Sequence, residues 1–367
     1  MTPVEFRRHL HRHPELSFRE EATAAFIEQQ LAAAGIACRR IAGTGVLARI
    51  EGRRPARTAV VLRADIDALP LGEQTGLPYA SQNEGVMHAC GHDIHAAVLF
   101  GVLQQLAADP DFAGTLFGLF QPGEELVPGG ASLVLAEDPF AGYEVRAVVG
   151  EHVEPQLEVG TLGFRAGQYM AANDELRFYV RGTGGHGALR SQLKDPVGAA
   201  AQLIGRLLDL NGPTTILSVG KVEAAGATNV IPDEVYLEGT LRTFDEEYRT
   251  ELQRQIAARA AEVDAAWGTR TELRIGHGYP CVVNDAALVE RAAALARTAG
   301  FAVEMLPLRT TSEDFGFYCR HYPALFYRLG VGTAAGRTHT AAFNPDERAI
   351  GIGAGFMQQL ARQLLNA

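Results

Sequence analysis

The sequence has little cysteine, no long apolar run and no excess of positive charge. Four cysteines among 367 residues, without a close-set pattern, argue against a disulfide scaffold. The longest apolar run near the middle, residues 96–103, is far shorter than the roughly 20 residues that span a bilayer. Lysine and arginine number 33 against 43 acidic residues, a net charge of −10. That sign is wrong for attracting phosphate backbones or anionic lipid, so we expect neither nucleic acid nor membrane as a partner.

We also expect no signal peptide, and the sequence shows no internal repeat or low-complexity tract. The first residues, MTPVEFRRHLHRHPE, are charged and interrupted by histidine and proline where a signal peptide needs an apolar core. With 47% hydrophobic and 21% charged residues the chain can bury a large core. We therefore expect a cytoplasmic protein of about two domains.

Short, continuously apolar segments alternate with segments of helical spacing at both ends of the chain. Buried strands are predicted at residues 45–50, 59–62, 116–120, 147–149 and 325–329. Helices are predicted at residues 3–35 (as two short ones), 96–107, 285–299 and 348–365. The alternation predicts an α/β domain with a largely parallel sheet that is covered on both faces.

The pattern changes between residues 170 and 277, where the predicted order becomes β-α-β-β-α-β. Strands are predicted at residues 175–180, 215–222, 235–242 and 271–275, with helices at 196–210 and 246–267. This order is typical of the split, ferredoxin-like α+β unit. The sequence thus predicts that residues 170–277 form a domain inserted into a larger catalytic domain of residues 1–169 and 278–367.

Polar clusters lie where ligands collect in α/β sheets, at the carboxyl ends of strands. The densest cluster, MHACGHDIH, holds one thiol, three imidazoles and a carboxylate within residues 88–95. Thiolate and imidazole suit zinc and Mn, Co, Ni or Fe, whereas calcium needs oxygen ligands. Cys90 and His92 are the candidate ligands, while His88 and His95 taken singly are more typical of core or capping histidines.

Two further clusters gain meaning from their place after predicted buried strands. In Glu124-Glu125, adjacent side chains point in different directions, so one carboxylate can bind metal while the other acts as a base. Two acids in a turn are otherwise often only solvated. His152 ends a predicted strand and His339 lies in a loop near the carboxyl terminus. Taken singly, each of these two histidines is more typical of a histidine without a functional role.

Together these segments resemble the M20 metallopeptidase clan, in its amidohydrolase branch of aminoacylase-like, hippurate and indole-acetyl-amino-acid hydrolases. The matching segments run in the family's order from residue 10 to 347: LHRHPELSFREE, LRADIDALP, MHACGHDIH, LFQPGEE, GEHV, GTGGHGA, TNVIPDEVYLEGTLRTF, TSEDFGFY and THTAAFNPDE. Such ordered coverage is more specific than any single motif.

The resemblance implies a site for two divalent transition metals, Zn, Mn, Co or Ni. It assigns the ligands to Cys90, His92, Glu125, His152 and His339, and the general base to Glu124. Arg63 stands where other members of the clan carry a metal-binding histidine, so Arg63 and Asp65 are left out of the ligand set. Asp67, His88 and Asp93 are expected to orient the ligands.

The resemblance also implies contributions from the inserted domain and a homodimer. His186 matches a histidine that the partner subunit supplies to stabilise the oxyanion. Asn229 and Arg242 match positions that hold the substrate's carboxylate, a task that suits the planar guanidinium. The chain departs from many relatives after GGHGA, where Leu189-Arg190-Ser191 replaces Met-Pro-His. This change is expected to alter substrate preference but not the reaction class.

The predicted activity is hydrolysis of a small N-acyl amino acid to a carboxylate and a free amino acid. An N-acetyldiaminopimelate deacetylase or a dipeptidase of the same clan is the alternative within this class. Two readings from other classes stay open. Cys90 could be a thiol nucleophile with a histidine base, or the chain could be a metal-bearing binding protein without catalysis.

Overall fold

The computed structural model describes residues 1–367, which fall into two compact units. The larger unit comprises Met1–Tyr169, Val282–Leu308 and Asp314–Ala367, and the smaller unit comprises Met170–Cys281 and Arg309–Glu313. Residues 278–281 and 309–313 thus belong to the smaller unit, outside the predicted insertion of 170–277. The Asn173 amide donates to the Tyr279 carbonyl at 3.1 Å, and Arg309 pairs with Met170, which ties both short segments to it.

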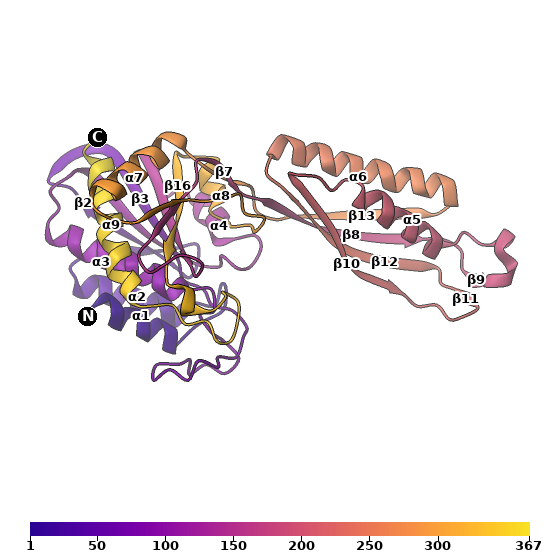
Figure 1. The fold of residues 1–367 in the computed structure, drawn as a ribbon, viewed down its shortest axis with the longest axis horizontal. Coiled ribbons are helices and arrows are strands. Elements are labelled where there is room, and N and C mark those ends of the chain that lie inside the picture. Colours follow the sequence, from indigo (N-terminus) through magenta and orange to yellow (C-terminus); the bar gives the residue numbers. More distant parts are fainter. The chain divides into compact units, whose positions relative to one another are not determined.

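An eight-stranded sheet forms the centre of the larger unit, with strand order β1-β2-β4-β3-β5-β16-β6-β15 (Figure 1). The strands are β1 (Ala37–Ile41), β2 (Gly45–Glu51), β3 (Arg54–Asp65), β4 (Ala113–Gln121), β5 (Glu144–Glu154), β6 (Leu162–Phe164), β15 (Val303–Met305) and β16 (Ala324–Gly330). The four central strands β4, β3, β5 and β16 are mutually parallel, whereas β1, β2 and β6 pair antiparallel. The predicted largely parallel α/β sheet is confirmed, with antiparallel additions that the sequence did not indicate.

Helices cover both faces of this sheet. They are α1 (Pro3–Arg12), α2 (Glu21–Ala33), α3 (His92–Ala108), α4 (Gly130–Ala136), α7 (Ala286–Thr298), α8 (Gly316–Cys319) and α9 (Arg348–Leu365). Helices α3 and α9 pack on each other and on β3. Side chains alternate between the faces of a strand, yet Val60, Val61, Leu62 and Arg63 of β3 are all buried. Continuous burial of this kind explains why the strands have no polar alternation in the sequence.

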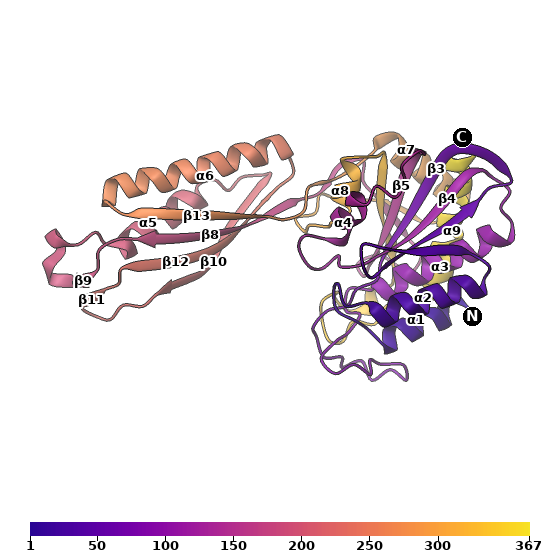
Figure 2. The ribbon, with the colours of Figure 1, turned by 180° about the vertical axis from the view of Figure 1, so that it is seen from behind.

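The smaller unit contains a four-stranded antiparallel sheet. Its two long helices lie on one face of that sheet (Figure 2). Its elements include β8 (Ala172–Arg181), α5 (Pro196–Leu208), β10 (Thr215–Ala224), β12 (Glu234–Thr243), α6 (Glu246–Trp267) and β13 (Arg270–His277), with sheet order β10-β12-β8-β13. The side chain of Asp245 caps α6 by accepting from the Tyr248 amide at 2.8 Å, and Gly268 ends the helix at φ +68°. Short strands β9 (Gly185–His186) and β11 (Val230–Ile231) pair with each other beside this sheet.

None of the helices is both long enough and apolar enough to cross a membrane.

Candidate metal centre

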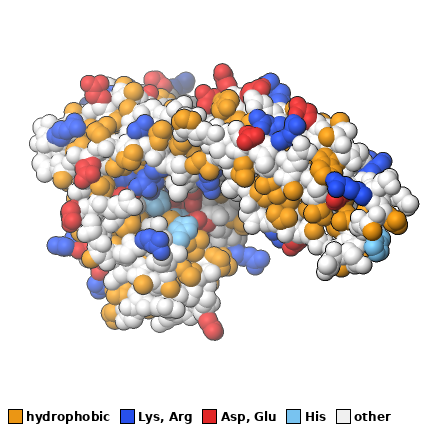
Figure 3. All heavy atoms as spheres, turned by 45° about the vertical axis from the view of Figure 1, so that its right-hand side comes forward, with side chains coloured by type: hydrophobic (Ala, Val, Ile, Leu, Met, Phe, Trp, Pro, Cys, Tyr) orange, Lys and Arg blue, Asp and Glu red, His pale blue; other side chains and the backbone are white.

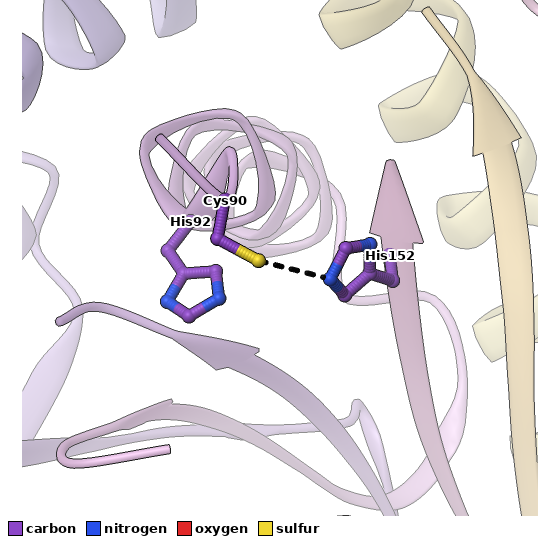
Figure 4. A group of neighbouring side chains, drawn as sticks. All are labelled: Cys90, His92 and His152. Carbon is purple, nitrogen blue, oxygen red and sulfur yellow. Dashed lines mark hydrogen bonds between the residues drawn. The ribbon is translucent and has the colours of Figure 1, made fainter. Parts of the chain in front are cut away.

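The five residues expected as metal ligands all lie in the larger unit, four of them at the ends of the central elements. Cys90 and His92 flank the start of α3, Glu125 follows β4, His152 lies in β5, and His339 lies in the loop after β16. Their ligand atoms form two groups of three, each within 4.8 Å: Cys90, His92 and His152 in one, and Cys90, Glu125 and His339 in the other. Figure 4 shows the first group, with its side chains turned toward one another. The Cys90 sulfur belongs to both groups.

Short distances link the two groups. The Sγ atom of Cys90 lies 3.3 Å from Nε2 of His152 and 3.3 Å from Nε2 of His339. The Oε1 atom of Glu125 lies 3.3 Å from Nε2 of His339 and 3.9 Å from Nε2 of His92. The structure therefore collects sulfur, nitrogen and oxygen atoms from four separate parts of the chain.

Hydrogen bonds orient two of these imidazoles. Nδ1 of His92 lies 2.9 Å from the Asp67 carbonyl oxygen, and Nδ1 of His152 lies 2.7 Å from the Val153 carbonyl oxygen. A carbonyl oxygen can only accept, so Nδ1 carries the proton in both rings and a neutral ring keeps a lone pair on Nε2. Nε2 of His92 is buried and has no hydrogen-bond partner. An unpartnered buried nitrogen beside a thiol and a carboxylate fits a divalent transition metal.

The backbone around these ligands adopts left-handed conformations. Gly91, between Cys90 and His92, has φ +94°, and a Cβ atom there would lie 2.7 Å from Cγ2 of Val153. His339 has φ +60° although it is not glycine, and its amide donates to the Ala89 carbonyl at 2.8 Å. Strain of this kind persists where surrounding contacts enforce it and is common at functional sites.

Burial and neighbouring charges shift the pKa values of the cluster. Burial raises the pKa of the Cys90 thiol, and the Glu125 carboxylate raises it further. Burial lowers the pKa of His152 well below its usual value. Burial also lowers the pKa of His92, but the charge of the Asp65 carboxylate and the hydrogen bond to Asp67 help to raise it, and that pKa lies well above the usual value. Without a cation, Cys90 is thus held as a thiol, whereas a bound metal ion would favour the thiolate.

The two neighbouring glutamates both approach the cluster. A carboxylate oxygen of Glu124 lies within 4.8 Å of ligand atoms of both His92 and Glu125. The Glu124 side chain is buried, and its Oε1 atom accepts from the Asp314 amide at 3.4 Å. A carboxylate outside the predicted ligand set, that of Glu124, therefore lies beside the cluster, where it could act as an acid and a base on a water molecule.

The three residues expected to orient the ligands lie in different surroundings. Asp67 contacts two parts of the cluster, because its Oδ1 lies 3.1 Å from Nδ1 of His92 and its Oδ2 accepts from the Glu125 amide at 3.0 Å. Asp93 instead accepts from Nε of Arg7 at 2.7 Å and pairs with Nδ1 of His11 at 2.8 Å. Both ring nitrogens of His88 are buried without a hydrogen-bond partner. Of the three, only Asp67 hydrogen-bonds a predicted ligand.

His95 lies in a neighbouring group with Asp65 and His92, yet both of its nitrogens are occupied. Nδ1 lies 2.5 Å from Oδ1 of Asp65, and Nε2 accepts from the Val153 amide at 2.9 Å. Arg63 donates to Asp65 at 2.7 Å in the same buried layer. The Asp65 carboxylate thus pairs with both Arg63 and His95, and its omission from the ligand set stays a prediction.

The sequence analysis missed residues that hydrogen-bond the groups next to the predicted ligands, above all Ser17 and Glu20. Ser17 Oγ donates to Oδ2 of Asp67 at 2.7 Å, and Glu20 accepts from the Gly123 amide at 2.8 Å. The only signal for them is their place in the LSFREE segment, which has no metal-ligating spacing.

The three remaining predicted residues, His186, Asn229 and Arg242, lie at two different ends of the smaller unit. His186 pairs with Val230 across β9 and β11, and the Gly187 amide donates to the Asn229 carbonyl at 2.9 Å. Arg242 lies near the other end of β12, where it donates to the Thr310 carbonyl at 3.0 Å and to Ser312 Oγ at 2.9 Å. Arg242 lies eight residue steps along β12 from Glu234, which is beside the β9–β11 end, and this is a distance of roughly 26 Å at 3.3 Å per residue. Asn229 therefore lies with His186, and Arg242 does not.

A cavity of about 590 Å³ borders Glu125 in the larger unit. Much of its lining is apolar. These apolar side chains come from residues 14–16, from residues 68–70 and from the residue after Glu125: Pro14, Leu16, Ala68, Leu69, Pro70 and Leu126. In the space-filling view, histidine side chains lie at the surface among charged groups (Figure 3). The volume lies within the range of small-molecule sites.

Comparison with known families supports the resemblance seen in the sequence. Residues 61–363 match the model of Peptidase family M20/M25/M40. An N-acetyl-L-cysteine deacetylase of Bacillus subtilis is 39% identical over 99% of this chain and 88% of its own length. An N-acetyldiaminopimelate deacetylase of Exiguobacterium sibiricum is 35% identical over 95% of each chain.

Solved structures agree with the sequence relatives. The YXEP protein of Bacillus subtilis, described as a dinuclear metal binding peptidase from the M20 family, superposes with a TM-score of 0.89. It is 34% identical and the match covers 99% of this chain and 97% of that one. The likeness extends over both units of the chain.

Proposed function

The chain belongs to Peptidase family M20/M25/M40, and from that premise we propose that it is a metal-dependent amidohydrolase of N-acyl amino acids. It cleaves the amide bond to give a carboxylate and a free amino acid. The observation that carries the proposal is the pair of ligand groups that share Cys90. Relatives named as an N-acetyl-L-cysteine deacetylase and an N-acyl-L-amino acid amidohydrolase support the same reaction class.

Five side chains would hold two divalent cations, Zn, Mn, Co or Ni: Cys90, His92, Glu125, His152 and His339. Two such cations, when bound, supply an acidified water and a polarised amide carbonyl. Asp67 fixes the ring of His92 and the backbone of Glu125 for this purpose.

Glu124 is the residue that moves protons in this proposal. Its carboxylate takes a proton from the attacking water and passes it to the departing nitrogen, so the same group is base and then acid. Glu125, its neighbour, keeps a ligand role because its Oε1 faces His92 and His339. The pair divides the two tasks that adjacent carboxylates can share.

The active form is a homodimer in the cytoplasm, with each site completed by the partner. His186 donates a hydrogen bond to the oxyanion and Asn229 accompanies it, whereas Arg242 holds the substrate's carboxylate. The roughly 26 Å between the two ends of β12 supports this division. One small substrate cannot touch both ends of the same smaller unit, so His186 and Arg242 of one chain serve two different sites.

The cavity beside Glu125 receives the acyl group. Its apolar lining admits groups larger than acetyl, such as benzoyl, and leaves the carboxylate to Arg242. A panel of N-acetyl and N-benzoyl amino acids, with N-acetyldiaminopimelate and dipeptides beside them, ranks these substrates by kcat/KM. A higher kcat/KM for larger apolar acyl groups supports this placement, and equal values across acyl sizes contradict it.

The same panel tests the reaction class. Chelation should abolish hydrolysis, and Mn, Zn, Co or Ni should restore it. Full activity after verified metal removal would falsify the proposal. Glu124→Gln should keep the metal and lose turnover, whereas Glu125→Gln should lose metal. A binding protein without catalysis would show no turnover to lose.

Two mixed variants test whether the site is shared. Chains with His186→Ala and chains with Glu124→Gln are each inactive in the proposal, but their mixture should recover part of the activity in heterodimers. No recovery after verified subunit exchange counts against sites completed across subunits.

The contact between Cys90 and His152 at 3.3 Å also suits a thiol nucleophile and its base. The electrostatics disfavour it, because the pKa of Cys90 is raised and that of His152 is lowered, which keeps both groups neutral. A trapped acyl-enzyme that survives chelation would restore that alternative.

A further inference from the structure

Glu20 begins α2 as its N-cap residue, yet its side chain does not cap that helix. The Glu15 carboxylate does so instead, by accepting from the amides of Ala22 at 3.3 Å and Thr23 at 2.7 Å. The Glu20 side chain, which is fully buried, turns toward β4. Burial of a carboxylate costs free energy unless the group is paired or hydrogen-bonded. The Glu20 carboxylate neither caps α2 nor pairs with a cation, so other hydrogen bonds must stabilise it.

One of these hydrogen bonds comes from the turn that carries Glu124. Oε1 of Glu20 accepts from the Gly123 amide at 2.8 Å, and Oε2 accepts from the Thr44 hydroxyl. Gly123 has φ +59°, and a Cβ atom there would lie 2.2 Å from the ring of Phe18. The turn is thus packed against the segment before α2 as well as hydrogen-bonded to it.

A second carboxylate holds the other side of Glu124. The Glu125 amide donates to Oδ2 of Asp67 at 3.0 Å. The amides on both sides of Glu124 are therefore held by buried acids, Glu20 before it and Asp67 after it. Asp67 also orients His92, so it bears on the proposed metal ligands, whereas Glu20 hydrogen-bonds none of them.

We propose that Glu20 is a positioning residue for Glu124: by holding the Gly123 amide it fixes the backbone from which the Glu124 carboxylate meets the reacting water. The proposal rests on the proposed function, in which Glu124 is the general base. Proton transfer in the transition state depends steeply on the placement of the base. Without Glu20 the buried Gly123 amide loses its acceptor, and the turn must shift to find another.

The test compares Glu20→Ala, Glu20→Gln and Thr44→Val in the metal-loaded enzyme. Glu20→Ala should lower kcat by ~10- to 100-fold, while KM and metal content stay unchanged. Glu20→Gln should restore most of kcat, because its amide oxygen can accept from Gly123 while its NH2 group donates to Thr44. Thr44→Val is the matched control, since it removes the same Thr44–Glu20 bond but keeps the one to Gly123.

Hydrogen exchange of the peptide that contains Gly123 supplies a readout independent of activity. Exchange there should accelerate in Glu20→Ala and stay slow in the other two variants. Wild-type kcat and slow exchange in Glu20→Ala overturn the proposal, as does an equal loss of kcat in Thr44→Val. A wild-type enzyme that hydrolyses no amide overturns the proposed function instead, and exchange at Gly123 then still decides whether Glu20 holds the turn.

Discussion

His88 offers a sharp test of the buried layer behind the ligands. Both of its ring nitrogens are buried without a hydrogen-bond partner, and burial lowers its pKa to about 4 from an ordinary 6.5. Its polar atoms therefore gain nothing from their surroundings. Leucine has a similar volume and no group to desolvate, so His88→Leu should leave the free energy of unfolding at pH 7.5 unchanged or raise it.

The stabilities of His88→Leu and the wild type should differ when the metal-free proteins are acidified. Between pH 6.5 and about 4, His88 is protonated in the unfolded chain but stays neutral in the folded chain. The free energy of unfolding of the wild type therefore falls as the pH drops toward 4. A fall in pKa from 6.5 to about 4 is worth ~3 kcal/mol, because each tenfold change in proton affinity is ~1.4 kcal/mol. The variant has no group that titrates at this position. The difference in free energy of unfolding between the variant and the wild type should therefore grow by ~3 kcal/mol by pH 4.

Urea unfolding followed by circular dichroism is the appropriate assay. Fluorescence is not, because the single tryptophan, Trp267, lies on α6 of the smaller unit. A His88→Leu protein with the pH dependence of the wild type would refute the electrostatic reasoning. Loss of metal from the variant at pH 7.5 would instead restore the expected role of His88 in orienting the ligands.

Two further substitutions probe the proposed metal site. Gly91→Ala should weaken metal affinity at least ~10-fold, because its φ of +94° and its contact with Val153 leave no room for a methyl group. Its control is Gly355→Ala in α9, where a Cβ atom meets nothing within 4 Å; metal affinity should not change there and stability should rise by ~0.5–1 kcal/mol. Asp67→Ala should lower metal affinity by ~10- to 100-fold in a competition titration, since it releases both His92 and the Glu125 amide. Unchanged affinity in either site variant would contradict the proposed ligand set.

Much of the fold follows from local pattern. Uninterrupted apolar runs at residues 59–62 and 116–120 indicate strands buried on both faces, and these became parts of β3 and β4. Strands β1, β6 and β15 escaped prediction. They are short and lie at or near the edges of the sheet, and exposed charged residues such as Arg39 in β1 and Glu304 in β15 interrupt the apolar runs that indicate buried strands.

The candidate ligands could be proposed from spacing and resemblance, but their neighbours could not. His92 and His95 lie one turn apart at the start of α3, and only the fold shows that both nitrogens of His95 are occupied. Asp93 follows His92 directly, yet helical rotation turns it toward Arg7 and His11. Asn229 and Arg242 looked alike in the sequence, and the length of β12 separates them.

The sequence by itself determined the chemical inventory and the order of elements. A thiol, imidazoles and carboxylates after buried strands indicate a transition-metal site, because donor type and the geometry of parallel sheets are local properties. Only the tertiary structure shows that the Cys90 sulfur lies in two groups of candidate ligand atoms, and that Glu20 is hydrogen-bonded to the turn before Glu124. Contacts between residues 90, 125, 152 and 339, or between 20 and 123, depend on long-range packing that no local period records.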